Sequence, residues 1–358
     1  MIKIDSLQQK LKELKLDALF VSGQENVTYL TGILGLSASE REAYLLITST
    51  QAYLLAYSTT IGMYRRISGF ELIELTTAFR LSQAVNEWAA KQKVNQLAFE
   101  KNNLSYAEYE SLKNKLKLNL IPTENIIEDL RLFKSPAEIL AIKKAAETTD
   151  LAYTYALSKI KKAISEKDLA LELEFFIRKN SQDIAFSPIV AFNENTAIPH
   201  YLPSAKIKLK DNSLVLIDMG AKYANYCADL TRVVFFGSPD DKQKEIFQIV
   251  TQANELAISS LAIGKTGEAI DTVTRNFIQQ KGFEPYKHGL GHGVGLAIHE
   301  APRLRPRIKE VLKENMVFTI EPGIYIEGFC GIRIEDIITL TASGPEVLSR
   351  APKSLTVL

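Results

Sequence analysis

Histidine, cysteine and tryptophan are scarce in this chain. Its 358 residues include four histidines, two cysteines and one tryptophan. Cys227 and Cys330 lie too far apart in the sequence to form a C-x-x-C zinc motif, and two cysteines are too few for a disulfide framework. We expect Cys227 to be a packing residue and Cys330, near a loop, to be inert.

Long apolar stretches and an excess of charge of either sign are also absent. No run approaches the ~20 apolar residues of a membrane span, and the N-terminal MIKIDSLQQKLKELKL carries charges throughout, unlike a signal peptide. The formal net charge is +1, which favours neither nucleic acid nor an anionic membrane surface as a partner. These absences predict a cytoplasmic globular protein, and the length suggests about two domains.

The first third of the chain alternates between helical and strand patterns, which predicts a compact α/β domain over residues 1–130. The stretch AYLLIT-STQ-AYLLAY predicts a hairpin with a short polar turn. The other expected elements are helices at 5–16, 80–92 and 105–117 and strands at 17–23, 96–100 and 118–121.

Residues 131–358 contain the same order of elements twice. Ser135 is a good N-cap for a long helix, because Pro136 suits the first helical position and Glu138 completes a capping box. Ser238-Pro239 is predicted to open a second long helix 103 positions later. Each long helix leads into a shorter helix and then into strands, so the order of elements predicts an internal duplication. The shorter helices are expected at 165–180 and 267–281.

The first of these halves contains a hairpin with two acidic residues, SLVLIDMGAKYANYCADLTRVVFFG. A turn centred between Tyr223 and Ala224 would place Asp218 directly opposite Asp229, with Cβ atoms roughly 4.5–5.5 Å apart. Like charges so placed repel each other. Either one carboxyl is protonated or a cation lies between them.

The second half contains a similar hairpin, VFTIEPGIYIEGFCGIRIEDIITL. Glu321 and Glu335 lie seven positions on either side of Gly328 and should face each other, and Asp218 precedes Glu321 by 103 positions. Acids in strands often only face solvent, but two facing pairs at one repeat offset favour a pocket of four carboxylates. Such a pocket needs about two divalent cations to be tolerable. Oxygen ligands suit manganese, magnesium or calcium, and an added imidazole favours manganese, cobalt or zinc.

Three of the four histidines lie in HGLGHGVGLAIHE, residues 288–300. Its glycines would let the backbone approach a crowded site, and its spacing matches neither the G-x-G-x-x-G nor the H-E-x-x-H motif. The fourth, His200, lies in ENTAIPHYLP just before the first acidic hairpin. A lone histidine is more often structural than a ligand, but this clustering beside paired acids predicts that all four serve one site.

At these residues the sequence resembles the pita-bread metallopeptidases, in particular the branch of Xaa-Pro dipeptidase (prolidase) and Xaa-Pro aminopeptidase (aminopeptidase P). The resemblance covers essentially the whole chain and rests on the phrases ENVTYLTG, LRLFKSPAEI, LIDMGA, ADLTR, GHGVG, TIEPG and RIED. It implies an α+β fold: a creatinase-like α/β domain at 1–130, then a pita-bread catalytic domain with a pseudo-two-fold repeat at 131–358.

The resemblance also implies a metal centre with two divalent ions, for which we expect manganese, with cobalt or zinc as alternatives. The implied ligands are Asp218, Asp229, His292, Glu321 and Glu335. Asp218 would bind one metal, Asp229 and Glu335 would bridge the two, and His292 and Glu321 would complete the second. The nucleophile would be a hydroxide that bridges the metals, with Glu321 as general base and proton shuttle.

Further residues match supporting positions of the family. His200 and His299 would contact the substrate and stabilise the tetrahedral intermediate, and His288 would lie behind the ligands, near the substrate. Arg333 resembles an arginine that orients a bridging acid, although it could form only a strand ion pair. Tyr325 matches a tyrosine near the site, although it could serve only in core packing.

The implied substrates are short peptides with a bond before proline. Arg303 in HEAPRLRP matches an arginine that in prolidases holds the carboxylate of the dipeptide, which favours a dipeptidase. Some short aminopeptidases carry arginine there too, so Xaa-Pro aminopeptidase is the alternative. A non-catalytic binding protein of the same fold is a remote alternative, because such relatives have lost metal ligands. The family usually forms homodimers, and we expect no nucleic-acid or membrane partner.

Overall fold

The computed structural model describes residues 2–35 and 40–358 and divides into two compact units, Met1–Arg131 and Leu132–Leu358. Within the described residues, no helix is both long and apolar enough to cross a membrane.

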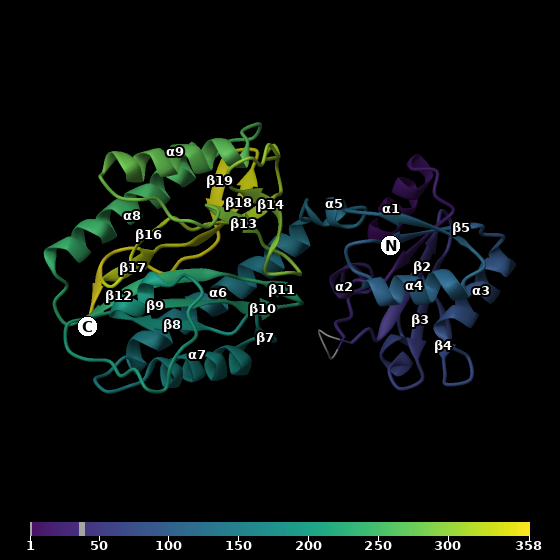
Figure 1. Ribbon diagram of the computed structural model, residues 1–358, viewed down its shortest axis with the longest axis horizontal. Coiled ribbons are helices and arrows are strands. Elements are labelled where there is room, and N and C mark those ends of the chain that lie inside the picture. Colours follow the sequence, from purple (N-terminus) through teal and green to yellow (C-terminus); the bar gives the residue numbers. More distant parts are fainter. Residues whose placement is uncertain (1, 36–39) are drawn as a thin grey trace. The chain divides into compact units, whose positions relative to one another are not determined.

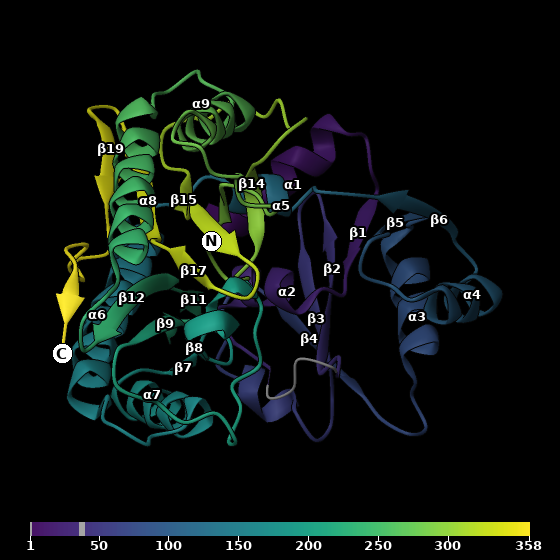
Figure 2. The ribbon, with the colours of Figure 1, turned by 60° about the vertical axis from the view of Figure 1, so that its left-hand side comes forward.

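The N-terminal unit is a mixed sheet with helices on both faces (Figure 2). The strand order is β4-β3-β2-β1-β5-β6, in which β1 pairs antiparallel with β2 and parallel with β5. The strands are β1 (Ala18–Val21), β2 (Ala43–Thr48), β3 (Ala52–Tyr57), β4 (Glu71–Leu75), β5 (Gln96–Glu100) and β6 (Asn119–Thr123). The helices are α1 (Ile2–Glu13), α2 (Gln24–Thr31), the 3₁₀ helix η1 (Ile61–Tyr64), α3 (Leu81–Gln92), α4 (Tyr106–Lys115) and α5 (Glu128–Arg131).

The predicted hairpin of this unit is confirmed: β2 and β3 pair antiparallel, and Ile47 lies opposite Ala52. The phrase ENVTYLTG forms most of α2, and its Asn26 is buried. The Asn26 amide donates to Glu100 (2.6 Å) and accepts from Arg131 Nη1 (2.8 Å). Glu100 also accepts from the backbone N–H groups of Ser22 and Gly23 at the start of α2. Asn26 therefore links α2 to the end of β5 and to α5.

The C-terminal unit contains the two predicted repeats. Its helices are α6 (Pro136–Lys159), α7 (Glu166–Asn180), the 3₁₀ helix η2 (Asn193–Ala197), α8 (Asp241–Ser260) and α9 (Gly267–Gln280). The strands before α8 are β7 (Asp183–Ile184), β8 (Ile189–Phe192), β9 (Ser213–Met219), β10 (Ala221–Tyr223), β11 (Tyr226–Cys227) and β12 (Leu230–Phe236). The later strands are β13 (Gly291–Gly293), β14 (Glu300–Leu304), β15 (Val317–Ile320), β16 (Gly323–Ile326), β17 (Cys330–Arg333), β18 (Asp336–Thr341), β19 (Gly344–Val347) and β20 (Thr356–Val357).

Each repeat packs its own helix pair against its own strands (Figure 1). Side chains of α6 and α7, such as Tyr153 and Leu173, share a core with β8, β9 and β12. Side chains of α8 and α9, such as Val250 and Ile278, share a core with β15, β17 and β18. The predicted packing role of Cys227 agrees with the structure, in which Cys227 and Cys330 are both buried.

The two long helices begin differently. Ser135 is the N-cap of α6 and forms the predicted capping box with Glu138. The predicted start of the second helix at Ser238-Pro239 is wrong by two residues, because Asp240 is the N-cap of α8 and forms a capping box with Gln243. The backbone N–H of Ser238 donates instead to Oδ1 of Asn212, which holds Ser238 in the preceding loop.

Candidate active site

Three of the four acidic residues, Asp229, Glu321 and Glu335, lie where the pairing of strands is interrupted. β9 pairs with β12 and β10 pairs with β11, and Asp229 lies in the gap between these ladders. β15 pairs with β18 and β16 pairs with β17, and Glu321 and Glu335 lie in the corresponding gap. The backbone N–H of Glu335 donates to the carbonyl of Thr231 (3.2 Å), which ties the second hairpin to the first. Acids of both hairpins therefore converge.

The register of the first hairpin differs from the prediction. Tyr223 lies opposite Tyr226, and Asp218 lies opposite Thr231 rather than opposite Asp229. The turn is centred one residue later than predicted, because Ala224 and Asn225 adopt left-handed conformations with φ of 46° and 72°. Asp218 and Asp229 are therefore diagonal neighbours, and, besides burial, the charge of Asp218 contributes to raising the pKa of Asp229.

The register of the second hairpin agrees with the prediction. Ile320 lies opposite Asp336 on one side of the gap, and Gly323 lies opposite Arg333 on the other. Both ladders share one register, which places Glu321 opposite Glu335. The turn is at Gly328, whose φ of +72° favours glycine.

Four carboxylates and one imidazole meet in a cavity of about 400 Å³. Nε2 of His292 lies 3.4 Å from Oε1 of Glu321 and 3.6 Å from Oδ2 of Asp229. Ligand atoms of Asp229, His292 and Glu335 lie within 4.8 Å of one another. Asp218 lines the same cavity. The structure thus brings together all five residues that the sequence singled out as metal ligands.

The negative charge of this cluster is only partly compensated, by Arg333, which forms an ion pair with Asp218. Burial and the neighbouring Glu335 raise the pKa of Asp229 well above its ordinary value, and burial followed by Glu321 does the same to the pKa of Glu335. Burial raises the pKa of Glu321 to about 8. Oδ1 of Asp218 is buried and has no hydrogen-bond partner among the described residues. An unpartnered buried oxygen among crowded carboxyl groups is what a cation would stabilise.

His292 is suited to join such a site as a neutral ligand. Burial and the nearby His299 lower its pKa to about 3, so the ring keeps a free lone pair at neutral pH. The surrounding glycines permit the close packing: a Cβ on Gly291 would lie 1.9 Å from the carbonyl oxygen of Thr319. The donor set of oxygens with one imidazole fits divalent ions such as manganese, cobalt or zinc.

Arg333 and Thr231 support the carboxylates from behind. Arg333 donates from Nη2 to Oδ2 of Asp218 (2.7 Å), from Nε to Oγ1 of Thr231 (3.0 Å) and from Nη1 to the hydroxyl of Tyr325 (2.9 Å). The Thr231 hydroxyl donates to Oε2 of Glu335 (2.7 Å). Arg333 therefore contacts Asp218 directly and reaches Glu335 only through Thr231.

The sequence analysis missed two threonines. Besides Thr231, the Thr319 hydroxyl donates to Oε1 of Glu321 (3.1 Å) and accepts from the backbone N–H of His292 (3.1 Å). Each lies two residues from an acidic ligand candidate, Asp229 or Glu321. Residues two apart in a strand share a face, so this spacing was the available signal.

The remaining histidines border the same cavity. His200, His288 and His299 all line it. The ring of His299 packs edge-on against His292 with centroids 4.4 Å apart. Nε2 of His288 forms a 2.9 Å hydrogen bond with the Tyr325 hydroxyl, and burial lowers the pKa of His288 to about 4. All four histidines thus serve one region of the molecule.

The cavity is also lined by cationic and apolar side chains. Arg303 is the strand partner of His292 and lines the cavity, as does Arg305. The apolar lining residues are Phe186, Ile189, Pro199 and Ile298. A small molecule in this cavity would therefore meet acidic, imidazole, guanidinium and apolar groups.

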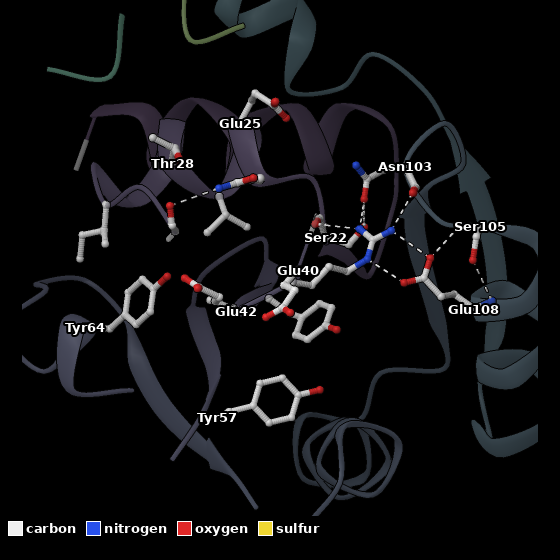
Figure 3. Close-up of a pocket in the computed structure, with 17 residues that line it drawn as sticks. Ser22, Glu25, Thr28, Glu40, Glu42, Tyr57, Tyr64, Asn103, Ser105 and Glu108 are labelled. Atoms are coloured by element: carbon white, nitrogen blue, oxygen red, sulfur yellow. Dashed lines mark hydrogen bonds and ion pairs between the residues drawn. The ribbon is translucent and has the colours of Figure 1, made fainter. Parts of the chain in front are cut away.

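A larger cavity of about 680 Å³ lies in the N-terminal unit (Figure 3). Arg41 lines it and binds the Glu108 carboxylate through Nε (2.7 Å) and Nη2 (2.9 Å), and it also donates to the carbonyl of Ser22. Its described lining contains no histidine. We therefore place the metal-binding chemistry in the smaller cavity of the C-terminal unit.

Comparison with known proteins agrees with this geometry. A model of metallopeptidase family M24 matches residues 141–342, and a model of the creatinase/prolidase N-terminal domain matches residues 3–133. An Xaa-Pro dipeptidase of Pyrococcus horikoshii is 34% identical over 98% of this chain and 100% of its own length.

Solved structures give the same result. An Xaa-Pro dipeptidase of Bacillus anthracis is 34% identical with a TM-score of 0.94, over 100% of this chain and 99% of its own. An X-Pro aminopeptidase of Thermotoga maritima is 32% identical with a TM-score of 0.89, over 98% of this chain and 100% of its own. The predicted fold class, a creatinase-like domain followed by a pita-bread domain, is confirmed. The chain belongs to metallopeptidase family M24 and carries the creatinase/prolidase N-terminal domain.

Proposed function

We propose that this protein is a metal-dependent exopeptidase that hydrolyses the bond before proline in Xaa-Pro dipeptides. The observation that carries the proposal is the convergence of five ligand-type side chains on one cavity that is also lined by arginine. Relatives that match nearly the whole chain are named Xaa-Pro dipeptidase, which supports the same activity.

The proposed metal centre holds two divalent ions, with manganese as the ion in use. The residues that would hold them are Asp218, Asp229, His292, Glu321 and Glu335. When bound, the ions would supply Lewis acidity that lowers the pKa of water and polarises the carbonyl of the substrate. Arg333 would hold Asp218 in place, and Thr231 would hold Glu335.

Proton transfer is assigned to Glu321. An Xaa-Pro bond is a tertiary amide whose nitrogen carries no hydrogen, so the proline nitrogen must receive a proton before it leaves. Glu321 would take a proton from the attacking water and deliver it to that nitrogen. His200 and His299, on the cavity wall, would donate hydrogen bonds to the oxygen that becomes negative.

The selection of substrates by length is assigned to Arg303. In a dipeptide the carboxylate follows the scissile bond by one residue, so its binding group must lie near the metal ligands. Arg303 is the strand partner of His292 and lines the cavity. A charge-assisted hydrogen bond from its guanidinium would select substrates that end at proline. The apolar residues Phe186, Ile189, Pro199 and Ile298 would contact the proline ring.

Cleavage of longer peptides is the alternative. The match to the X-Pro aminopeptidase of Thermotoga maritima, over nearly the whole of both chains, supports this alternative. The proposal also retains a homodimer as the assembly and the cytoplasm as the compartment, both from the family resemblance and the sequence. Size-exclusion chromatography with light scattering tests the dimer.

The proposed function is tested by removing and restoring metal. The protein is stripped with EDTA, and hydrolysis of Ala-Pro is followed with and without manganese, beside Ala-Ala as a substrate without proline. We expect activity on Ala-Pro only with metal and little activity on Ala-Ala. Failure to cleave Ala-Pro under any metal condition would overturn the proposal.

A further inference from the structure

Asn254 lies behind the two glutamates of the second hairpin and touches the backbone of both their strands. It belongs to α8 and is fully buried. Its Nδ2 donates to the carbonyl of Ile320 (3.0 Å) and to the carbonyl of Ile334 (3.3 Å). Ile320 immediately precedes Glu321, and Ile334 immediately precedes Glu335. One side chain thus joins the two peptide groups that lead into the two glutamates.

These contacts fall where the sheet provides the least support. The β15–β18 ladder ends at Ile320 and Asp336, and the β16–β17 ladder begins at Gly323 and Arg333. Between these ladders the backbone N–H of Glu321 donates to the carbonyl of Leu290, and the N–H of Ile334 donates across the hairpin to the carbonyl of Pro322 at 3.4 Å. Asn254 adds a link from outside the sheet where this long hydrogen bond joins the two chains.

The orientation of the Asn254 amide is set by its partners. Nζ of Lys353 donates to Oδ1 of Asn254 (3.0 Å) and lies 3.0 Å from Oδ2 of Asp336. An ammonium group only donates and a carbonyl only accepts. The amide oxygen must therefore face Lys353, and the amide nitrogen must face the two carbonyls.

Lys353 is itself held in place by the first repeat. Arg232 of β12 donates to the carbonyl of Ala351 (2.8 Å), to the carbonyl of Glu335 (2.6 Å) and to Oδ1 of Asp336 (2.7 Å). The carboxylate of Asp150, on α6, accepts from the backbone N–H of Ala351 (2.8 Å). The segment that carries Lys353 thus connects α6 and β12 with the strands of the glutamates.

The first repeat has a related contact. Thr149 of α6 is buried, and its hydroxyl accepts a hydrogen bond from the backbone N–H of Ala221 (3.0 Å). Ala221 borders the gap between the β9–β12 and β10–β11 ladders. In each repeat, a polar side chain of the long helix binds the backbone where strand pairing is interrupted.

We propose that Asn254, oriented by Lys353, is a positioning residue that sets the separation of Glu321 and Glu335 and thereby the affinity for the metal pair. This inference rests on the proposed function, because it requires those glutamates to be ligands. Asn254 is not among the described residues that line the cavity, so it acts through the backbone of the glutamates. Loss of its amide would leave two carbonyls without this donor and let the two chains move apart.

The test measures the manganese affinity of metal-free wild type and metal-free variants by titration calorimetry. In Asn254→Asp the shape is kept, but an oxygen faces the two carbonyls in place of the amide nitrogen. We expect affinity to fall about 10- to 100-fold, as for other groups that support metal ligands. Val250→Ala is the matched control, because Val250 is a buried core residue of the same helix. It should melt earlier than the wild type but bind manganese within about two-fold of it.

A second variant covers the case in which Asn254→Asp does not fold. Lys353→Met removes the donor that orients the amide, at a side chain that is 26% exposed. We expect a several-fold loss of manganese affinity, with kcat for Ala-Pro reduced and KM nearly unchanged.

The outcomes separate this inference from the proposed function. Wild-type protein that binds two ions and shows EDTA-sensitive hydrolysis supports the function. If the folded variants of Asn254 and Lys353 then bind manganese as tightly as wild type, the inference is wrong and the function stands. If wild-type protein binds no divalent ion, both are wrong.

Discussion

Glu321 and Glu335 lie opposite each other in a gap between two strand ladders that share one register. Neither residue belongs to a strand ladder. Both side chains line the cavity that also contains Asp218, Asp229 and His292. The same hairpin thus carries two of the proposed metal ligands, one of which, Glu321, is also the proposed proton shuttle.

Glu321→Gln should nearly abolish turnover while the fold is retained. The amide cannot accept the proton of the attacking water and is a weaker ligand, so we expect kcat for Ala-Pro to fall about 10²–10⁴-fold. Steady-state kinetics and circular dichroism measure the two effects. Glu327→Gln is the matched control, because Glu327 is an exposed glutamate of the same hairpin and should keep wild-type kinetics. Near-normal turnover in Glu321→Gln would remove Glu321 from the mechanism.

Arg303→Ala should discriminate between substrates by their length. If Arg303 binds the carboxylate of a dipeptide, its loss should raise KM for Ala-Pro about 10- to 100-fold, the worth of a hydrogen bond to a charged group. KM for Ala-Pro-Ala should change little. Arg307→Ala, an exposed arginine nearby, serves as the control. Equal effects of Arg303→Ala on both peptides would give this arginine a structural role instead.

The stability of the metal-free fold should fall as the pH rises, whereas the affinity for manganese should increase. Burial raises the pKa of Glu321 from 4.5 to about 8. Because the folded pKa is the higher one, this group stabilises the metal-free fold fully below pH 4.5, and the contribution is lost as the pH rises through about 8. Metal binding requires ionised carboxylates, so manganese should bind more tightly as the pH rises and should release protons.

Melting curves across this window measure the effect. The melting midpoint of metal-free wild type, relative to that of metal-free Glu321→Gln, should fall as the pH rises. Added manganese should remove this fall. A relative midpoint that rises with pH would show that Glu321 is not a buried, proton-binding carboxyl in the metal-free protein.

Local sequence signals predicted the elements of the fold well where one signal acted alone. The strand at 96–100 and the capping box of Ser135 with Glu138 agree with the structure. The errors arose where the sequence signal competed with another local or tertiary interaction. At the start of α8, Asp240 displaced Ser238, which a distant residue, Asn212, holds in a loop. In the first hairpin, the left-handed conformations of Ala224 and Asn225 moved the turn by one residue.

The site was predictable to the extent that its chemistry is visible in residue type. Acids and histidines at unusual positions indicated a metal centre, and the structure brings these five side chains together. Residues that support the acids are not marked by residue type, and the two threonines are marked only by their spacing from an acid. Thr231 looks like an ordinary strand residue, and Asn254 looks like a polar residue on a helix surface. Only tertiary packing shows that both are fully buried.

The most direct measurement compares initial rates on Ala-Pro and Ala-Pro-Ala with the manganese-loaded protein. We expect rapid cleavage of Ala-Pro and slow or no cleavage of Ala-Pro-Ala, because the Arg303 guanidinium would bind the proline carboxylate, which is free in the dipeptide and part of a peptide bond in the tripeptide. Preferential cleavage of the tripeptide would contradict the dipeptidase assignment and make the protein an Xaa-Pro aminopeptidase. Cleavage of neither peptide would contradict the peptidase function itself.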